Sequence, residues 1–185
     1  MKDDLLQEVI RIRDYADLII TENEVHCAID QIGTNLNKVI NETVPVFLCV
    51  MKGGLPFTSE LMKRTQIPLE LDYVHVDRYR DKTQGSSIHW HKEPSIDLTN
   101  RFVVLLDDIF DEGYTMQELI AYCIENGANK VMSAVLLKKI LGNKCTDYEP
   151  DFVGLTIEDR YVFGWGMDYK GYWRNLTNVY AVSEE

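Results

Sequence analysis

The order of hydrophobic segments predicts an α/β fold with a central, mainly parallel twisted sheet flanked by helices. Apolar runs of strand length alternate along the chain with longer stretches whose apolar residues recur every three or four positions. The strand-length runs are apolar at nearly every position, which is typical of strands that helices cover on both faces. With 185 residues and no repeat or linker-like segment, residues 1–185 are expected to form a single domain.

Two helices are predicted before the first buried strand. Apolar residues between positions 5 and 10 indicate the first helix. Thr21 and Glu24 have the spacing of a capping box, and the helical apolar stripe behind them runs to Ile40. The continuous apolar run at 46–51 then predicts a strand buried on both faces.

The region from this strand to residue 94 predicts a helix, a strand and a long loop. Lys52-Gly53-Gly54 ends the first strand, and Pro56 fits the first turn of the helix that follows. Residues 69–76 are rich in β-forming side chains. Residues 78–94 lose this pattern and are too many for an ordinary connection, so we expect a functional loop there.

The second half repeats the alternation of strand and helix. An apolar strand at 103–106 leads through several acids into a helix that opens at Thr115, for which Gly127 is the expected C-cap. Residues 131–137 predict another buried strand. Two short strands are expected near the end of the chain, at 152–155 and 179–182.

Composition narrows the classes of function. The formal net charge of −11 argues against a nucleic-acid-binding protein, because such binding depends largely on basic surface. No apolar run is long enough to span a bilayer, and the start Met-Lys-Asp-Asp lacks the basic-then-apolar order of a secretory signal. The four cysteines have no metal-ligand spacing and indicate free thiols. We therefore expect a cytoplasmic protein.

The segment 103–117 carries the clearest chemical signal. Asp107 and Asp108 directly follow an apolar strand, and Asp111 and a turn at Gly113 precede a helix. Backbone N–H groups at the start of that helix, together with the helix dipole, can hold a phosphate dianion. The paired carboxylates can accept hydrogen bonds from ribose hydroxyls or approach a hydrated Mg²⁺. The segment therefore predicts a site for a phosphorylated ribose.

Three other segments can contribute to the same site. The glycines of Lys52-Gly53-Gly54 follow a strand and let backbone amides approach an anion, which favours a diphosphate contact. Lys138-Lys139 ends the strand at 131–137 with two lysines, and one of them can donate a hydrogen bond to a base carbonyl. The segment 161–169 is aromatic without helical or strand periodicity, and this composition suits stacking on a planar heterocycle.

The histidines predict no metal site from their spacing. His89-Trp90-His91 is the one close pair in the sequence, and histidines two apart in a loop more often lie at a surface or interface. Walker A, Gly-x-Ser-x-Gly and Gly-x-Gly-x-x-Gly patterns do not occur, so the sequence gives no support for an NTPase, a hydrolase or a dinucleotide-binding protein.

Taken together, these motifs resemble the hypoxanthine-guanine phosphoribosyltransferases, which have the type I phosphoribosyltransferase fold. The resemblance extends from about Val46 to Val182, and the motifs occur in the order found in the family. It implies a central parallel sheet with a small hood formed by terminal segments. It also implies a divergent bacterial branch, because several motif positions depart from the usual residues.

The resemblance implies a role for each motif residue. Asp111 would be the catalytic acid/base. The ribose and its 5′-phosphate would be held by Asp107, Asp108, Glu112, Gly113, Tyr114 and Thr115. Diphosphate would be held by Lys52, Gly53 and Arg174. In the family, the peptide bond that precedes this lysine is typically cis. The purine would be bound by Lys138, Tyr161 and Val162. Mg²⁺ would be held by Asp168, Asp107 and Asp108.

Three positions depart from the usual pattern. Glu112 stands where threonine or serine is common, and it brings a negative charge beside a phosphate. Tyr114 replaces a frequent lysine. In the loop at about 78–94, which the resemblance implies is mobile and closes over the site, Tyr79 is the expected counterpart of the usual tyrosine.

The implied activity is purine salvage with Mg²⁺ as cofactor. The enzyme would transfer 5-phosphoribosyl from 5-phospho-α-D-ribosyl 1-diphosphate to hypoxanthine or guanine, giving IMP or GMP and diphosphate. The expected partners are thus a 6-oxopurine base and phosphoribosyl diphosphate, with no nucleic acid and no membrane, in a homodimer or homotetramer. Alternatives are an RNA-binding regulator of the same fold, as in pyrimidine attenuation, or a transferase that prefers xanthine. An orotate or adenine transferase is disfavoured by Lys138 and the aromatic segment.

Overall fold

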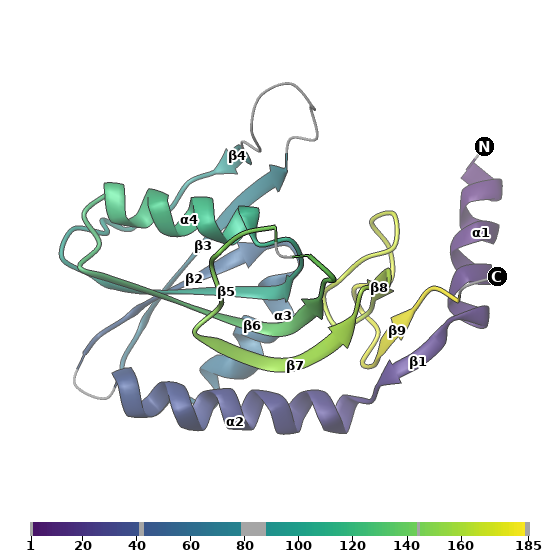
Figure 1. Ribbon diagram of the computed structural model, residues 1–185, viewed down its shortest axis with the longest axis horizontal. Coiled ribbons are helices and arrows are strands. Elements are labelled where there is room, and N and C mark those ends of the chain that lie inside the picture. Colours follow the sequence, from purple (N-terminus) through teal and green to yellow (C-terminus); the bar gives the residue numbers. More distant parts are fainter. Residues whose placement is uncertain (1, 41–42, 79–87, 144, 184–185) are drawn as a thin grey trace.

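The computed structural model describes residues 2–40, 43–78, 88–143 and 145–183, with only the backbone for residues 2, 3 and 78. Its centre is a six-stranded sheet in the order β4-β3-β2-β5-β6-β7 (Figure 1). The strands are β2 (Val46–Met51), β3 (Glu70–Arg78), β4 (Ile88–Lys92), β5 (Phe102–Phe110), β6 (Lys130–Ile140) and β7 (Phe152–Glu158). All neighbours pair in parallel except β3 and β4, so the predicted α/β class with a mainly parallel sheet is confirmed.

Helices cover both faces of this sheet (Figure 1). Helices α2 (Glu22–Ile40) and α3 (Gly54–Met62) pack on one face, where Val104, Leu106 and Leu136 point into the core. Helix α4 (Tyr114–Glu125) packs on the other face against Val103 and Leu105. Successive residues of β5 thus enter different cores, as the alternation of side chains along a strand requires.

A second, three-stranded sheet forms a small hood at the carboxyl end of the central sheet (Figure 1). It contains β1 (Asp17–Ile20), β9 (Val179–Ala181) and β8 (Val162–Phe163), in the order β1-β9-β8. Helix α1 (Lys2–Tyr15) lies beside it, and the indole of Trp173 donates to the carbonyl of Val9 at 2.7 Å. The terminal segments therefore build the hood, as expected.

Both helix boundaries predicted from capping motifs are confirmed. The backbone N–H of Thr21 donates to the carboxylate of Glu24 at 2.8 Å, and the N–H of Glu24 donates back to the Thr21 hydroxyl at 3.4 Å. At the end of α4, Gly127 has a φ of 84° and its N–H donates to the carbonyl of Ile124 at 3.0 Å.

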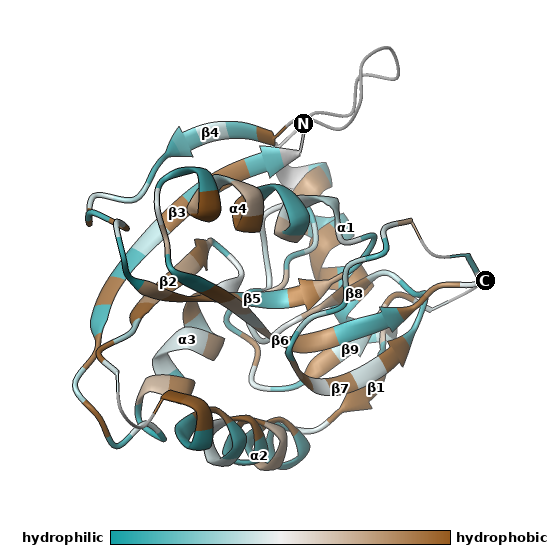
Figure 2. Cartoon of the chain, turned by 60° about the vertical axis from the view of Figure 1, so that its left-hand side comes forward, coloured by the Kyte–Doolittle hydropathy of each residue, from teal (hydrophilic) through white to brown (hydrophobic). Residues whose placement is uncertain are grey.

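The strand that carries the acids is longer than the sequence indicated. Strand β5 continues through Asp107 and Asp108 to Phe110, because its pairing with β6 continues to Lys138. Its pairing with β2 ends earlier, at Leu106. In Figure 2 the mainly apolar β5 is interrupted by a hydrophilic stretch near its end. Asp107 and Asp108 therefore lie beside β6 within the sheet, but beyond the last residue of β5 that pairs with β2.

Three strands were not predicted, and one of them corrects the expected loop. Residues 88–92 form β4, so the loop expected at 78–94 is strand at that end. The other two, β1 and β8, have four and two residues, which is too short for a periodic signal. Among the described residues, no helix is both long and apolar enough to cross a membrane. All four cysteines are free.

Gly154 offers a test of the packing of α2 on β7. A Cβ at this position would lie 2.6 Å from the carbonyl oxygen of Leu136 and 3.3 Å from Ile32. Gly154→Ala should therefore lower the free energy of unfolding by about 1–3 kcal/mol, measured by urea denaturation. Gly142→Ala is the matched control, since a Cβ there meets nothing within 4 Å. Equal stability of the two variants would contradict this packing.

Candidate active site

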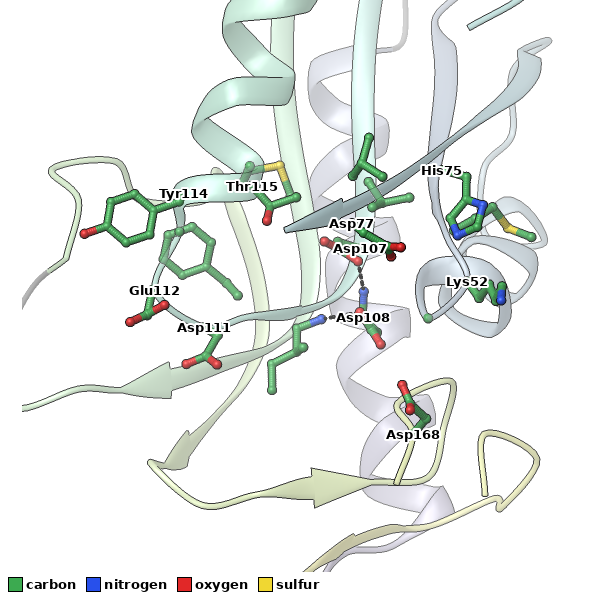
Figure 3. Close-up of a pocket in the computed structure, with 18 of the residues that line it drawn as sticks. Lys52, His75, Asp77, Asp107, Asp108, Asp111, Glu112, Tyr114, Thr115 and Asp168 are labelled. Atoms are coloured by element: carbon green, nitrogen blue, oxygen red, sulfur yellow. Dashed lines mark hydrogen bonds between the residues drawn. The ribbon is translucent and has the colours of Figure 1, made fainter. Parts of the chain in front are cut away.

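A cavity of about 380 Å³ opens at the carboxyl ends of the central strands, where β2, β3 and β5 meet the hood (Figure 3). Open parallel sheets generally bind their ligands at this edge. The cavity brings together the residues that were predicted to hold ribose, phosphate, diphosphate and metal, and the predicted catalytic acid/base Asp111. They are Lys52, Gly53, Asp107, Asp108, Asp111, Glu112, Gly113, Tyr114, Thr115, Asp168 and Arg174.

Two adjacent carboxylates form the floor of this cavity. Asp107 accepts a hydrogen bond from the backbone N–H of Asp108 at 2.9 Å, and Asp108 accepts one from Ile109 at 3.0 Å. Burial raises the pKa of Asp107 well above its usual range, and the neighbouring charge of Asp108 raises it further. Burial also raises the pKa of Asp108, which is 8% exposed, although Arg174 opposes this shift. The pair is thus costly to ionise without a cation.

The loop after β2 packs directly onto this pair. Its Met51–Lys52 peptide is cis, as the family resemblance implied. A Cβ on Gly53 would lie 1.8 Å from a carboxylate oxygen of Asp108, so only glycine allows the loop to approach so closely. The side chain of Lys52 lies at the rim of the cavity in Figure 3.

The opposite wall is the turn into α4. Gly113 is the N-cap residue with a φ of 87°, a left-handed conformation that side chains disfavour. A Cβ there would also meet the ring of Phe110 at 2.5 Å. Thr115 follows in the first turn of the helix, and Figure 3 shows it on the cavity side. This wall therefore presents the positive end of a helix dipole to the cavity.

The hood supplies the third wall through Asp168 and Arg174. The guanidinium of Arg174 pairs with Asp168 at 2.5 Å and donates to the carbonyl of Gly166 at 2.6 Å. The backbone N–H of Gly171 donates to the second carboxylate oxygen of Asp168 at 2.6 Å. A Cβ on Gly166 would lie 2.1 Å from the carbonyl oxygen of Gly53. The hood is thus in direct contact with the loop after β2.

A second hollow of about 250 Å³ adjoins the first and shares Asp108, Asp111 and Asp168 with it. Its other lining residues include Tyr161, Val162 and Lys139. Tyr161 is 55% exposed, and its hydroxyl donates to the carbonyl of Asp168 at 3.2 Å. An exposed aromatic face beside buried apolar residues is suited to a flat heterocycle.

Lys138 was predicted to bind the purine, but the second hollow is lined by Lys139 and not by Lys138. Lys138 forms an ion pair with Glu149 and lines another hollow beside Tyr148, which Lys139 and Asp111 also line. The ammonium group of the next residue, Lys139, lies 3.4 Å from Asp111 and 3.1 Å from Asp159. Strand β6 continues to Ile140 and carries both lysines, and of the two only Lys139 reaches the second hollow.

Two ionisable residues of the main cavity were missed, and one predicted residue, Tyr79, lies outside the described residues. His75 and Asp77 line the main cavity from β3, and their two-residue spacing on one face of a strand was the available signal. Tyr79, and most of the loop assigned to closure, lie outside the described residues.

The arrangement combines two places for an anion with a buried pair of acids. The start of α4 and the loop at Lys52 flank the two carboxylates, at opposite sides of one cavity (Figure 3). A ligand with phosphate groups at two ends and hydroxyls between them would match this order of groups. The adjoining hollow with Tyr161 and Lys139 provides space for a planar ring next to it.

Comparison with known proteins agrees with this geometry. A family model described as the phosphoribosyl transferase domain matches residues 20–171. The chain is 31% identical to the hypoxanthine-guanine phosphoribosyltransferase of Bacillus subtilis, over 90% of this chain and 92% of that protein. It is also 31% identical to the Streptococcus pneumoniae enzyme of the same name, over 93% of this chain and 96% of that one.

A solved structure gives the same answer for the fold. The hypoxanthine phosphoribosyltransferase of Staphylococcus aureus superposes with a TM-score of 0.85 at 26% identity, covering 90% of this chain and 91% of that one. Sequence, fold and cavity therefore agree, and the chain belongs to the hypoxanthine-guanine phosphoribosyltransferase family, as a divergent member of its bacterial branch.

Proposed function

We propose that this protein is a purine-salvage enzyme that transfers 5-phosphoribosyl from 5-phospho-α-D-ribosyl 1-diphosphate to hypoxanthine or guanine. The proposal rests on one observation: two adjoining hollows share Asp111 as a lining residue. One hollow has the groups for a ribose with phosphates at both ends, and the other has an aromatic face and a lysine for a 6-oxopurine. The names of the relatives support the same reaction.

The sugar phosphate would lie across the main cavity. Its 5′-phosphate would accept hydrogen bonds from backbone N–H groups of residues 112–115 at the start of α4. The ribose hydroxyls would donate to Asp107 and Asp108. Diphosphate would lie at the other side, against Lys52, Gly53 and Arg174. Charge that develops on the departing diphosphate would be stabilised there by two cationic side chains.

The carboxylate donors fit a hard divalent cation. Asp107 and Asp108 are adjacent, their pKa values are raised by burial, and Asp168 faces them from the hood. Oxygen donors of this kind suit Mg²⁺, which commonly bridges carboxylates and phosphates. When bound, Mg²⁺ would neutralise charge on the diphosphate. The protein itself contributes by holding the carboxylates of Asp107, Asp108 and Asp168 around one cavity.

The base would occupy the second hollow with its face on Tyr161 and one edge along Val162. Lys139, rather than Lys138, would donate a hydrogen bond to the 6-oxo group. Asp111 is 50% exposed and reaches both hollows, so its carboxylate can take or return the proton of the purine ring. Closure of the loop near Tyr79, a cytoplasmic location and a homodimer or homotetramer stay predictions from the family resemblance.

An RNA-binding regulator of the same fold is the second candidate. The net charge of −11 opposes it, since RNA affinity depends on basic surface. The relatives that match most of the chain are named as transferases. A transferase that prefers xanthine remains open as a variant of the proposed reaction.

The test of the proposed function is the rate of diphosphate release with different bases. At fixed phosphoribosyl diphosphate and Mg²⁺, we expect turnover with hypoxanthine or guanine and little with adenine or uracil. Xanthine measured in the same series decides the variant reaction. No turnover with any 6-oxopurine, together with a gel shift of RNA, would contradict the proposal in favour of the regulator.

The same series of bases tests the assignment of the lysine. Lys139→Ala should lower kcat/KM for 6-oxopurines by roughly 10–100-fold, because a buried 6-oxo group would lose its charged donor at a cost of about 1.5–3 kcal/mol. Lys138→Ala removes the same side chain one residue earlier, from the ion pair with Glu149. It should leave these rates nearly unchanged. The reverse pattern would restore the assignment made from sequence.

Asp111→Asn tests the proton transfer. The amide keeps the size of the side chain but cannot accept the ring proton. We therefore expect kcat to fall by about 10²–10⁴-fold, the usual size of general acid/base catalysis, with a smaller change in KM for phosphoribosyl diphosphate. The check is steady-state kinetics with hypoxanthine; an unchanged kcat would refute the acid/base role.

Asp107→Asn tests the cost of the buried acid pair. Because the pKa of Asp107 is raised in the folded protein, stability is lost as pH rises above about 3.8, the ordinary value, until the folded-state pKa is passed. In EDTA at neutral pH the variant should be more stable than the wild type, and the gain should disappear near pH 4. Urea denaturation measures both; a variant less stable at neutral pH would contradict the argument.

A further inference from the structure

A cluster of two histidines and one aspartate lies at the rim of the main cavity, apart from the carboxylates of the floor. His75, Asp77 and His91 each offer one ligand atom, and these atoms lie within 4.8 Å of one another. The Nε2 atom of His91 is 2.6 Å from an Oδ of Asp77. The rings of His75 and His91 have centroids 4.5 Å apart and are tilted by 30°.

The antiparallel pair β3–β4 builds this cluster. His75 and Asp77 are two residues apart in β3, so their side chains lie on the same face of the sheet. On β4 the register shifts by one between His75↔Lys92 and Val76↔Trp90, so His91 is the extra residue of a bulge. A bulge turns its side chain out of the regular alternation, which here brings His91 between His75 and Asp77.

The donor set selects one class of ligand. Two imidazoles and a carboxylate are the ligands of borderline divalent transition metals such as Zn²⁺, and such sets commonly leave positions open for water or substrate. Mg²⁺ prefers oxygen donors alone and so suits the acids of the floor instead. An ion pair between His91 and Asp77 alone would not explain why the ring of His75 also packs against the ring of His91.

The cluster lies where a bound metal ion would be open to the main cavity. His75 and Asp77 line the main cavity, and Figure 3 shows both on the same side as Lys52. Asp77 is 68% exposed, so the cluster is accessible from solvent. The imidazole of His91 lowers the pKa of Asp77, and Lys52 adds to this shift, which agrees with a carboxylate that is ionised at neutral pH.

We propose that His75, Asp77 and His91 form a second metal site that binds one Zn²⁺-like divalent cation, with its open positions directed to the cavity. Water or an anion oxygen would complete the coordination. The site is distinct from the carboxylates at Asp107, Asp108 and Asp168. It does not depend on the proposed reaction, because it is defined by binding alone.

The test is a Zn²⁺ titration of the whole protein in excess Mg²⁺, which occupies oxygen-only sites. We expect one equivalent of Zn²⁺ to bind, and the imidazole NMR signals of His75 and His91 to shift while that of His26 does not. His75→Gln and His91→Gln should each weaken Zn²⁺ binding by roughly 100-fold or more, since loss of a direct ligand should exceed the 10–100-fold cost of losing an outer partner.

Two control variants define the ligand set. His89→Gln changes a histidine of the same strand whose ring packs edge-on against His91 without belonging to the cluster, so it should keep full affinity. Cys27→Ser removes the exposed thiol that could bind Zn²⁺ elsewhere, and it should also keep it. Circular dichroism checks the fold of each variant. The proposal is overturned if no Zn²⁺ binds, if either histidine variant binds normally, or if either control loses binding.

Discussion

The burial of two neighbouring carboxylates at the end of β5 is the constraint on which the rest of the site depends. Charged groups in a protein interior are costly unless they are paired or bind a metal. Here Asp107 and Asp108 accept hydrogen bonds from local backbone N–H groups, and burial nevertheless raises the pKa of both. Such an arrangement lowers stability and is retained at places where a ligand or cation supplies the missing charge.

The loop after β2 packs closely against this acid pair, and the hood packs closely against that loop. The loop after β2 can approach Asp108 only because Gly53 has no side chain, and the hood reaches this loop only because Gly166 has none. Asp168 and Arg174 are then held by hydrogen bonds within the hood, so that both face the cavity. The floor, the loop and the hood thus form one contiguous unit. A side chain at Gly53 would push the loop away from Asp108, and a side chain at Gly166 would push the hood away from the loop.

Periodicity and capping rules were sufficient for the buried strands and the four helices, because each is long and strongly patterned. The turn at Gly113 before α4 was also predictable, because a glycine after several acids commonly marks a turn between a strand and a helix. The strands β1, β4 and β8 were not predictable from local pattern, because each depends on pairing with a segment outside itself. The bulge at His91 has the same origin: register is a property of two strands, whereas a sequence motif describes one.

The length of β6 decided which lysine faces the second hollow. If the strand had ended at Leu137, the two lysines would have followed in a loop, and nothing would have fixed which one points to the base. The strand continues to Ile140 and pairs with β7 through Lys138 and Lys139. Lys139 lines the second hollow, whereas Lys138 forms an ion pair with Glu149. Which of two neighbouring lysines lines a hollow thus depends on the length and the pairing of the strand that carries them, and a local motif records neither.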